Sequence, residues 1–187
     1  VDELRRWDDA RVKPLVAASQ GVHLVLPRSF LPGSAALMIP RTADGRVLFA
    51  IPWHGRLVVG TTDTPDVPIS EDPVPLEQEI EFILAHARRY LAHDPSESDV
   101  LSVFAGLRPL VKAPNAKKTS LLSRDHTIIV SSSGLITITG GKWTTYRRMA
   151  KDTTDNAAFV GKLEKRPCVT EELKLAGWTD KTDGDPL

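Results

Sequence analysis

Two short runs of the sequence, 106–110 and 140–147, combine glycine with a cationic side chain. In the second run, alternating β-formers at 135–139 precede two glycines, and a helical pattern follows them. A junction of strand, Gly-Gly and helix leaves backbone N–H groups unpaired, and the helix macrodipole favours negative charge there. The sequence therefore predicts a place for a phosphate or for the electron-rich ring of a flavin. The two runs are Gly106-Leu107-Arg108-Pro109-Leu110 and Gly140-Gly141-Lys142-Trp143-Thr144-Thr145-Tyr146-Arg147.

The second run is not a P-loop. Trp143 follows the Gly-Lys pair where that motif needs Ser or Thr, and Ile136 stands where its first glycine should fall. A lysine in the first turn of a helix opposes the macrodipole, so we favour a functional role for Lys142 over simple packing. Thr144 or Thr145 is a natural N-cap, which needs no function.

Two arginines are candidate phosphate ligands, because a guanidinium offers a fork that suits phosphate oxygens. Pro109 favours extended backbone at Arg108, although the local sequence alone also describes an exposed strand arginine. Arg124 lies in Ser123-Arg124-Asp125-His126, and its alternative role is a weak surface ion pair.

His23 is the candidate general base. It lies on the strand face opposite Val22 and Leu24, outside the apolar stripe, and a histidine titrates near neutral pH. The alternative is a structural histidine. His126 is a weaker candidate, and His54 is expected to be exposed in a turn. Thr61 and Thr62 either line a flavin or form a Ser/Thr turn.

Composition excludes several classes of protein. The 187 residues carry 24 basic and 24 acidic side chains with no long basic run, so no nucleic-acid partner is expected. The single Cys168 excludes a disulfide framework and a multi-cysteine metal site, and we expect no metal. No apolar run approaches the ~20 residues of a membrane helix, and the first residues are not a signal peptide. These features predict a cytoplasmic protein and leave open a peripheral association with the inner membrane face.

Hydrophobic periodicity predicts an α+β fold, with an antiparallel or mixed β-sheet and flanking helices. The turn signals Asp44-Gly45 and His54-Gly55 separate strands of an antiparallel meander. A helix over 76–91 ends before Asp94-Pro95, and a second helix spans 144–159. The predicted strands are 22–26, 35–40, 46–51, 56–60, 100–110, 126–130 and 135–139.

Six motifs between Ser19 and Ala158 resemble the FAD-dependent glycerol-3-phosphate dehydrogenases, and they occur in order along the chain. They are Gly21-Val22-His23-Leu24-Val25, Phe49-Ala50-Ile51-Pro52-Trp53, Gly60-Thr61-Thr62-Asp63-Thr64, Gly106 to Leu110, Ser123 to His126, and Gly140 to Arg147.

The resemblance implies a flavoprotein of the D-amino-acid-oxidase type, in which an FAD domain carries a β-sheet substrate cap. It assigns 1–130 to the substrate-binding cap region, 131–160 to the last strand and helix of the FAD-binding domain, and 161–187 to a linker towards a missing C-terminal domain. The N-terminal Rossmann half is expected to be missing, because no GxGxxG loop is present. The fragment alone is therefore expected to be inactive.

The resemblance also implies a reaction, the oxidation of sn-glycerol 3-phosphate to dihydroxyacetone phosphate by hydride transfer to FAD, with electrons passing to quinone. Arg108 and Arg124 would bind the small-molecule phosphate substrate, and His23 would accept the hydroxyl proton. Lys142 would reach the substrate or the flavin edge. The remaining cofactor-binding candidates are Gly140, Gly141, Trp143, Thr144, Thr61 and Thr62.

Two alternatives remain open from the sequence. A related FAD-dependent amine or amino-acid oxidase would bind a carboxylate with one cationic clamp, whereas Arg108, Arg124 and Lys142 together favour phosphate. A ligand-binding β-domain without enzymatic activity has no reason to carry the glycine–lysine helix start.

Overall fold

The computed structural model describes residues 1–42, 45–112 and 125–178. The chain divides into two compact units, each described here by itself. One unit comprises Val1–Val16 with Ser123–Leu187, and the other comprises Ala17–Leu122. We call them the terminal unit and the central unit.

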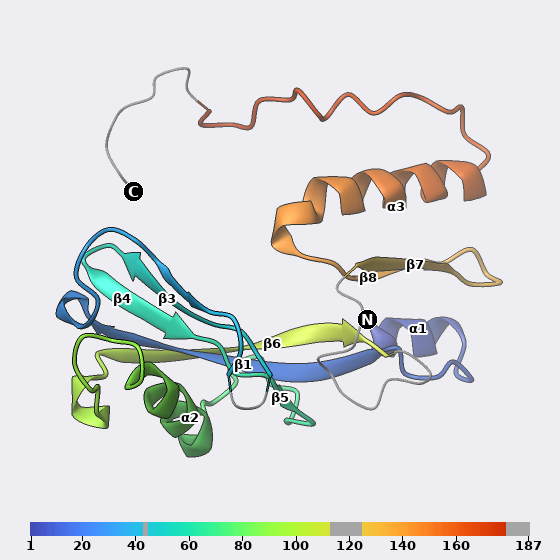
Figure 1. Ribbon diagram of the computed structural model, residues 1–187. Coiled ribbons are helices and arrows are strands. Elements are labelled where there is room, and N and C mark those ends of the chain that lie inside the picture. Colours follow the sequence, from blue (N-terminus) through green and yellow to red (C-terminus); the bar gives the residue numbers. More distant parts are fainter. Residues whose placement is uncertain (43–44, 113–124, 179–187) are drawn as a thin grey trace. The chain divides into compact units, whose positions relative to one another are not determined.

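The central unit is built on a β-sheet in the order β2-β3-β4-β1-β5, with β6 also paired to β1 (Figure 1). The β1–β4, β3–β4 and β2–β3 pairs are antiparallel, which confirms the predicted meander. Arg124 lies outside the described residues. The strands are β1 (Val16–Pro27), β2 (Leu37–Ile39), β3 (Leu48–Trp53), β4 (Arg56–Gly60), β5 (Thr64–Pro65) and β6 (Ser102–Val111).

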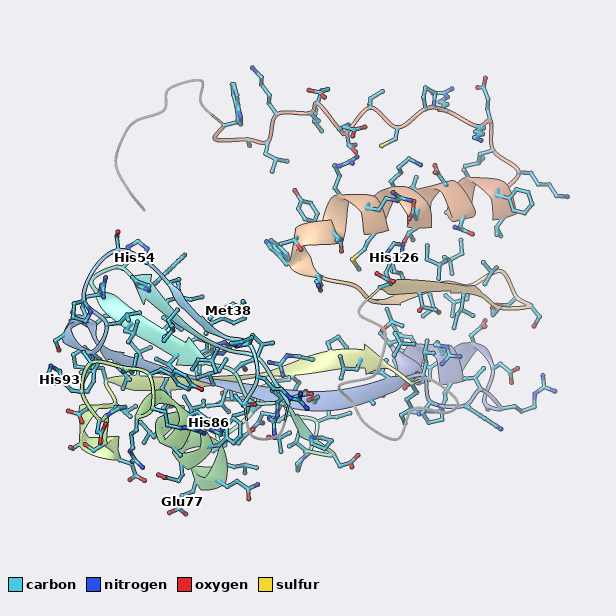
Figure 2. All side chains as sticks on the ribbon, viewed as in Figure 1. Met38, His54, Glu77, His86, His93 and His126 are labelled. Carbon is cyan, nitrogen blue, oxygen red and sulfur yellow. The ribbon has the colours of Figure 1, made fainter. Side chains whose placement is uncertain are left out.

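A two-residue turn joins β3 to β4. His54 has φ 44° and Gly55 has φ 71°, as a tight hairpin turn with two left-handed residues requires. The turn is therefore the one that the sequence predicts, and Figure 2 shows His54 at the tip of this hairpin. The other predicted turn includes Asp44, which lies outside the described residues.

The core lies between one face of the sheet and helix α2 (Glu77–Ala87) (Figure 1). Every second residue of β1, from Val22 to Leu26, is fully buried against this helix. Burying each such side chain contributes about 1.5–3 kcal/mol relative to leaving it exposed. The core residues are Val22, Leu24, Leu26, Phe30, Ile39, Leu48, Ala50, Leu57, Val59, Ile83, Leu84 and Ala87.

The terminal unit contains helix α1 (Asp2–Asp8), the antiparallel hairpin of β7 (His126–Val130) and β8 (Ile136–Gly140), and helix α3 (Tyr146–Val160). A 3-10 turn, η4 (Trp143–Thr145), leads directly into α3. His126, labelled in Figure 2, is the first residue of β7, and its Nε2 lies 3.1 Å from Asp152 Oδ2 of α3. This pair ties the hairpin to the helix.

The observed elements are α+β, as predicted, but some boundaries differ. Residues 125–130 group with the terminal unit rather than with the preceding sheet, because Val130 pairs with Ile136 across the hairpin. Helix α2 ends at Ala87, four residues before the predicted end. The sequence pattern did not predict α1, which has no buried residue, or β5, which is two residues long. Two further 3-10 turns, η1 (Arg28–Phe30) and η2 (Glu97–Asp99), flank the core.

Candidate functional site

One face of β1 packs into the core, and the opposite face carries the candidate site residues. Alternate residues of a strand point to opposite sides, so Ser19, Gly21 and His23 share the face opposite the core. In this part of the strand each of these three residues meets a polar or aromatic partner from another segment. This face of β1 is where the candidate site of the central unit is built.

Arg108, on β6, lies across the backbone of β1. Its Nη1 donates to the Thr62 carbonyl at 3.0 Å, and its Nη2 donates to Thr61 Oγ1 at 2.9 Å. A Cβ added to Gly21 would lie 2.2 Å from Arg108 Nη2, so only glycine leaves room for the guanidinium here. The side chain is 35% exposed, so a ligand in solution can reach it.

Asp63 supplies a negative charge beside Arg108, with Oδ1 3.6 Å from Nη1. Ser19 Oγ donates a hydrogen bond to the same carboxylate oxygen. The pair orients the guanidinium and also offsets one positive charge. A dianion bound here therefore calls for a second cation besides Arg108, and Arg124, the predicted partner, lies outside the described residues.

His23 lies next to Arg108 on the same face. Its ring stacks on Phe104 of β6, with centroids 5.0 Å apart and planes 10° from parallel. A Cβ on Gly60, its register partner in β4, would lie 2.3 Å from His23 Cδ2. Burial first, and then the charge of Arg108, lower the pKa of His23 below its ordinary 6.5. The imidazole is therefore neutral at pH 7, as a proton acceptor must be.

Thr62 faces the other way, into the core. The residue is 1% exposed, and its hydroxyl accepts from Val22 N at 2.9 Å and donates to Glu79 Oε1 at 3.0 Å. A hydroxyl used in this way cannot reach a cofactor, so we replace the predicted flavin contact of Thr62 with a structural role. Thr61 is partly buried and accepts from Arg108, so it belongs to the arginine's surroundings.

In the terminal unit, the strand–Gly-Gly–helix junction forms as predicted. Gly140 and Gly141 have φ 75° and 76°, a conformation that other residues adopt only with strain. A Cβ on Gly141 would lie 2.4 Å from Met149 Sδ, so this glycine also lets the turn pack against α3.

The residues after the two glycines are exposed. The Lys142 amide donates to Thr145 Oγ1 at 3.2 Å, and Thr145 Oγ1 donates to the Lys142 carbonyl at 3.0 Å. The Lys142 amide therefore already has a partner, whereas the amides of Trp143 and Thr144 lie at the start of the helical run. Trp143, a predicted cofactor-binding residue, is 86% exposed, and its ring stacks on Tyr146.

The structure thus gathers His23, Arg108 and Thr61 in the central unit. It gathers Gly140, Gly141, Lys142, Trp143 and Thr144 in the terminal unit. Three residues around the first set were not predicted, namely Asp63 beside Arg108, Ser19 bonded to Asp63, and Phe104 stacked on His23. A signal for Ser19 was present, because it is two and four residues before Gly21 and His23 and so shares their face. His126, the weaker candidate base, pairs with Asp152 of α3.

The family model described as FAD dependent oxidoreductase matches residues 1–147, and the chain belongs to this family. Its resemblance to glycerol-3-phosphate dehydrogenases is confirmed by relatives and by a solved structure. The mitochondrial glycerol-3-phosphate dehydrogenase SDP6 of Arabidopsis thaliana is 47% identical over 94% of this chain and 28% of its own length. The mitochondrial glycerol-3-phosphate dehydrogenase of Homo sapiens is 44% identical over 96% of this chain and 25% of its own length.

The solved structure is that of the glycerol-3-phosphate dehydrogenase from Bacillus halodurans complexed with FAD. It superposes with a TM-score of 0.73 at 37% identity, covering 90% of this chain and 32% of that one. The chain thus spans about a quarter of the length of its curated relatives.

The described residues contain neither a membrane-spanning helix nor a cluster of metal ligands. No helix among them combines the length and apolar character needed to cross a membrane. Within the same residues, no three His, Cys, Asp or Glu side chains gather in a way that suits a metal ion.

Proposed function

We propose that this chain is part of a longer FAD-dependent glycerol-3-phosphate dehydrogenase that oxidises sn-glycerol 3-phosphate to dihydroxyacetone phosphate. The observation that carries the proposal is Arg108 held over Gly21 beside a neutral, partly buried His23. A phosphate ligand next to a proton acceptor is what oxidation of a phosphorylated alcohol needs. The names of the relatives support the same substrate.

In this proposal the central unit is the substrate-binding cap. Arg108 binds the phosphate, and its hydrogen bonds to Thr61 and Thr62 hold the guanidinium in place before the substrate arrives. Because Asp63 offsets one charge, Arg124 is proposed as the second ligand of the dianion. His23 takes the hydroxyl proton, and a positioned base contributes ~10²–10⁴-fold to the rate.

The terminal unit is proposed to include the end of the FAD-binding domain. FAD, when bound, supplies the acceptor for the hydride. The residues fit such a group, because the Trp143 and Thr144 amides open a helical run and Lys142 adds a cation beside them. We propose that Gly140 and Gly141 set the turn that presents these groups, with Lys142 contacting the substrate or the flavin edge.

Quinone is the proposed electron acceptor, and the chain by itself is proposed to be inactive. The place of the protein in the cell stays a prediction. The sequence favours the cytoplasm and leaves open a peripheral association with the inner membrane face, whereas the names of the plant and human relatives contain the word mitochondrial. Fractionation against markers of each compartment decides between them.

The experiment is anaerobic addition of sn-glycerol 3-phosphate to the purified full-length flavoprotein while the flavin absorbance is followed. We expect prompt bleaching, lost in Arg108→Ala. Bleaching by an amine or an amino acid instead would overturn the substrate and favour the related oxidases. A full-length protein that neither carries nor takes up flavin would overturn the enzyme itself and favour the ligand-binding domain.

A further inference from the structure

Glu79 is a carboxylate in the interior of the central unit, where side chains of this kind are rare. It lies in the first turn of α2 and is 2% exposed. Among the described residues, no lysine, arginine or histidine nitrogen pairs with it within 4.0 Å, so neutral donors alone satisfy the carboxylate. Burying a charge in this way is costly unless every hydrogen bond is made, which points to a specific role.

Four donors converge on this carboxylate. Gln20 Nε2 and the Leu76 amide donate to Oε2 at 2.6 and 2.9 Å. The hydroxyls of Thr62 and Thr64 both donate to Oε1. Capping α2 would need only the Leu76 bond. The other three bonds reach β1 and the segment 61–64, so Glu79 does more than cap its own helix.

The hydrogen bonds also fix the ionisation of Glu79. Burial by itself raises the pKa of the carboxyl, but the bonds from Thr64, Leu76, Gln20 and Thr62 outweigh it and leave the pKa below its ordinary value. The group is therefore ionised at neutral pH and only accepts hydrogen bonds. The Thr62 hydroxyl must then donate to Glu79, which leaves it free to accept from Val22 N.

Thr62 connects this interior network to the candidate site. Its hydroxyl faces Glu79, and its carbonyl accepts the 3.0 Å hydrogen bond from Arg108 Nη1. Its neighbour Thr61 receives the second hydrogen bond of the same guanidinium. Rotation of the Thr62 peptide would therefore move the acceptors on which Arg108 rests.

We infer that Glu79 is a positioning residue for Arg108, acting through Thr62 to hold the 61–64 segment in the conformation that presents the guanidinium to the substrate phosphate. The inference rests on the proposed function. Glu79 touches no substrate. Its effect is on how well phosphate is bound, and not on the chemical step.

The test is stopped-flow reduction of the full-length flavoprotein by sn-glycerol 3-phosphate, which separates the dissociation constant from the limiting rate of reduction. In Glu79→Gln, an amide that must donate replaces an oxygen that only accepts. We expect the dissociation constant to rise about tenfold or more, because a hydrogen bond to a charged group is lost, while the limiting rate changes less than threefold (~0.6 kcal/mol).

A second pair of variants decides the matter if Glu79→Gln does not fold. Thr62→Val removes the hydroxyl at nearly constant volume and should weaken substrate binding as Glu79→Gln does. Thr62→Ser keeps the hydroxyl and should bind the substrate as the wild type does. Ile83→Val, in the same helix and fully buried, is the control for loss of stability. It should lower Tm and leave the dissociation constant unchanged.

Two results overturn the inference. If the wild type is reduced normally and both Glu79→Gln and Thr62→Val lower Tm with an unchanged dissociation constant, Glu79 is structural only and the proposed function stands. If the wild-type flavin is not reduced by sn-glycerol 3-phosphate, the proposed function fails and the inference fails with it.

Discussion

Gly21→Ala tests whether the absence of a side chain at position 21 makes room for the Arg108 guanidinium. The new Cβ would lie 2.2 Å from Nη2, 2.5 Å from Cζ and 2.6 Å from Nη1 of that arginine. The strand backbone at this position accepts alanine, since Gly21 is not among the residues with positive φ. The guanidinium is the flexible end of a long side chain, so the arginine moves and the strand stays.

The size of the movement follows from the distances. An ordinary carbon contact begins at 3.4 Å, so Nη2 retreats by about 1.2 Å. Hydrogen bonds of 2.9 and 3.0 Å to Thr61 and Thr62 do not survive a shift of that size. A misplacement of ~1 Å costs about 10²-fold in kcat/KM, which is about 2.7 kcal/mol. Because water can replace the lost bonds of a partly exposed arginine, the free energy of unfolding should change by about 1 kcal/mol or less.

The assay is kcat/KM for sn-glycerol 3-phosphate on the full-length flavoprotein, together with Tm. Gly106→Ala is the matched control, because Gly106 lies in β6 two residues before Arg108 and its added Cβ would meet nothing within 4 Å. We expect about a 10²-fold loss for Gly21→Ala and wild-type behaviour for Gly106→Ala. A Gly21→Ala enzyme with wild-type kcat/KM would falsify the reasoning. A collapse of Tm in parallel with activity would show that Gly21 serves the fold instead.

Two further predictions concern His23 and Gly141. Because burial and then Arg108 lower the pKa of His23 below 6.5, kcat/KM should be level at neutral pH and fall only below pH 6.5, an acid limb that His23→Asn should abolish along with ~10²–10⁴-fold of the rate. Below pH 6.5 the unfolded state binds a proton that native His23 does not bind. The free energy of unfolding should therefore decrease as the pH is lowered in wild type, and decrease less in His23→Asn. Equal dependence of the unfolding free energy on pH in the two proteins would contradict the burial argument. Gly141→Ala combines left-handed backbone strain of about 1–2 kcal/mol with a Cβ only 2.4 Å from Met149 Sδ. Gly134→Ala is the control, because Gly134 has φ 92° but its added Cβ would lie 3.7 Å from the nearest atom. Gly141→Ala should therefore reduce Tm and bound FAD more than Gly134→Ala does. Met149→Ala should recover only the steric part, and equal losses in both glycine variants would remove the packing role.

The sequence alone was enough for the local features of this protein. The alternation of Val22, Leu24 and Leu26 with His23 predicted both the buried face of β1 and the histidine on its other side, because residues two apart share a face. The glycines at 140 and 141 predicted the junction between a strand and a helix, and the structure adds that both adopt left-handed backbone. The ordered motifs led to the family, which the comparison confirms.

What surrounds those residues was decided by the tertiary structure. Thr62 and Glu79 are 17 positions apart, Ser19 and Asp63 are 44 apart, and Arg108 and Thr62 are 46 apart. No periodicity connects such positions, because their contacts depend on how β1, β6 and α2 come together. The same limit hid the reason for Gly21, whose missing Cβ matters only once Arg108 lies over it. A strand pattern shows which face a residue occupies, and only packing shows which side chain it meets there.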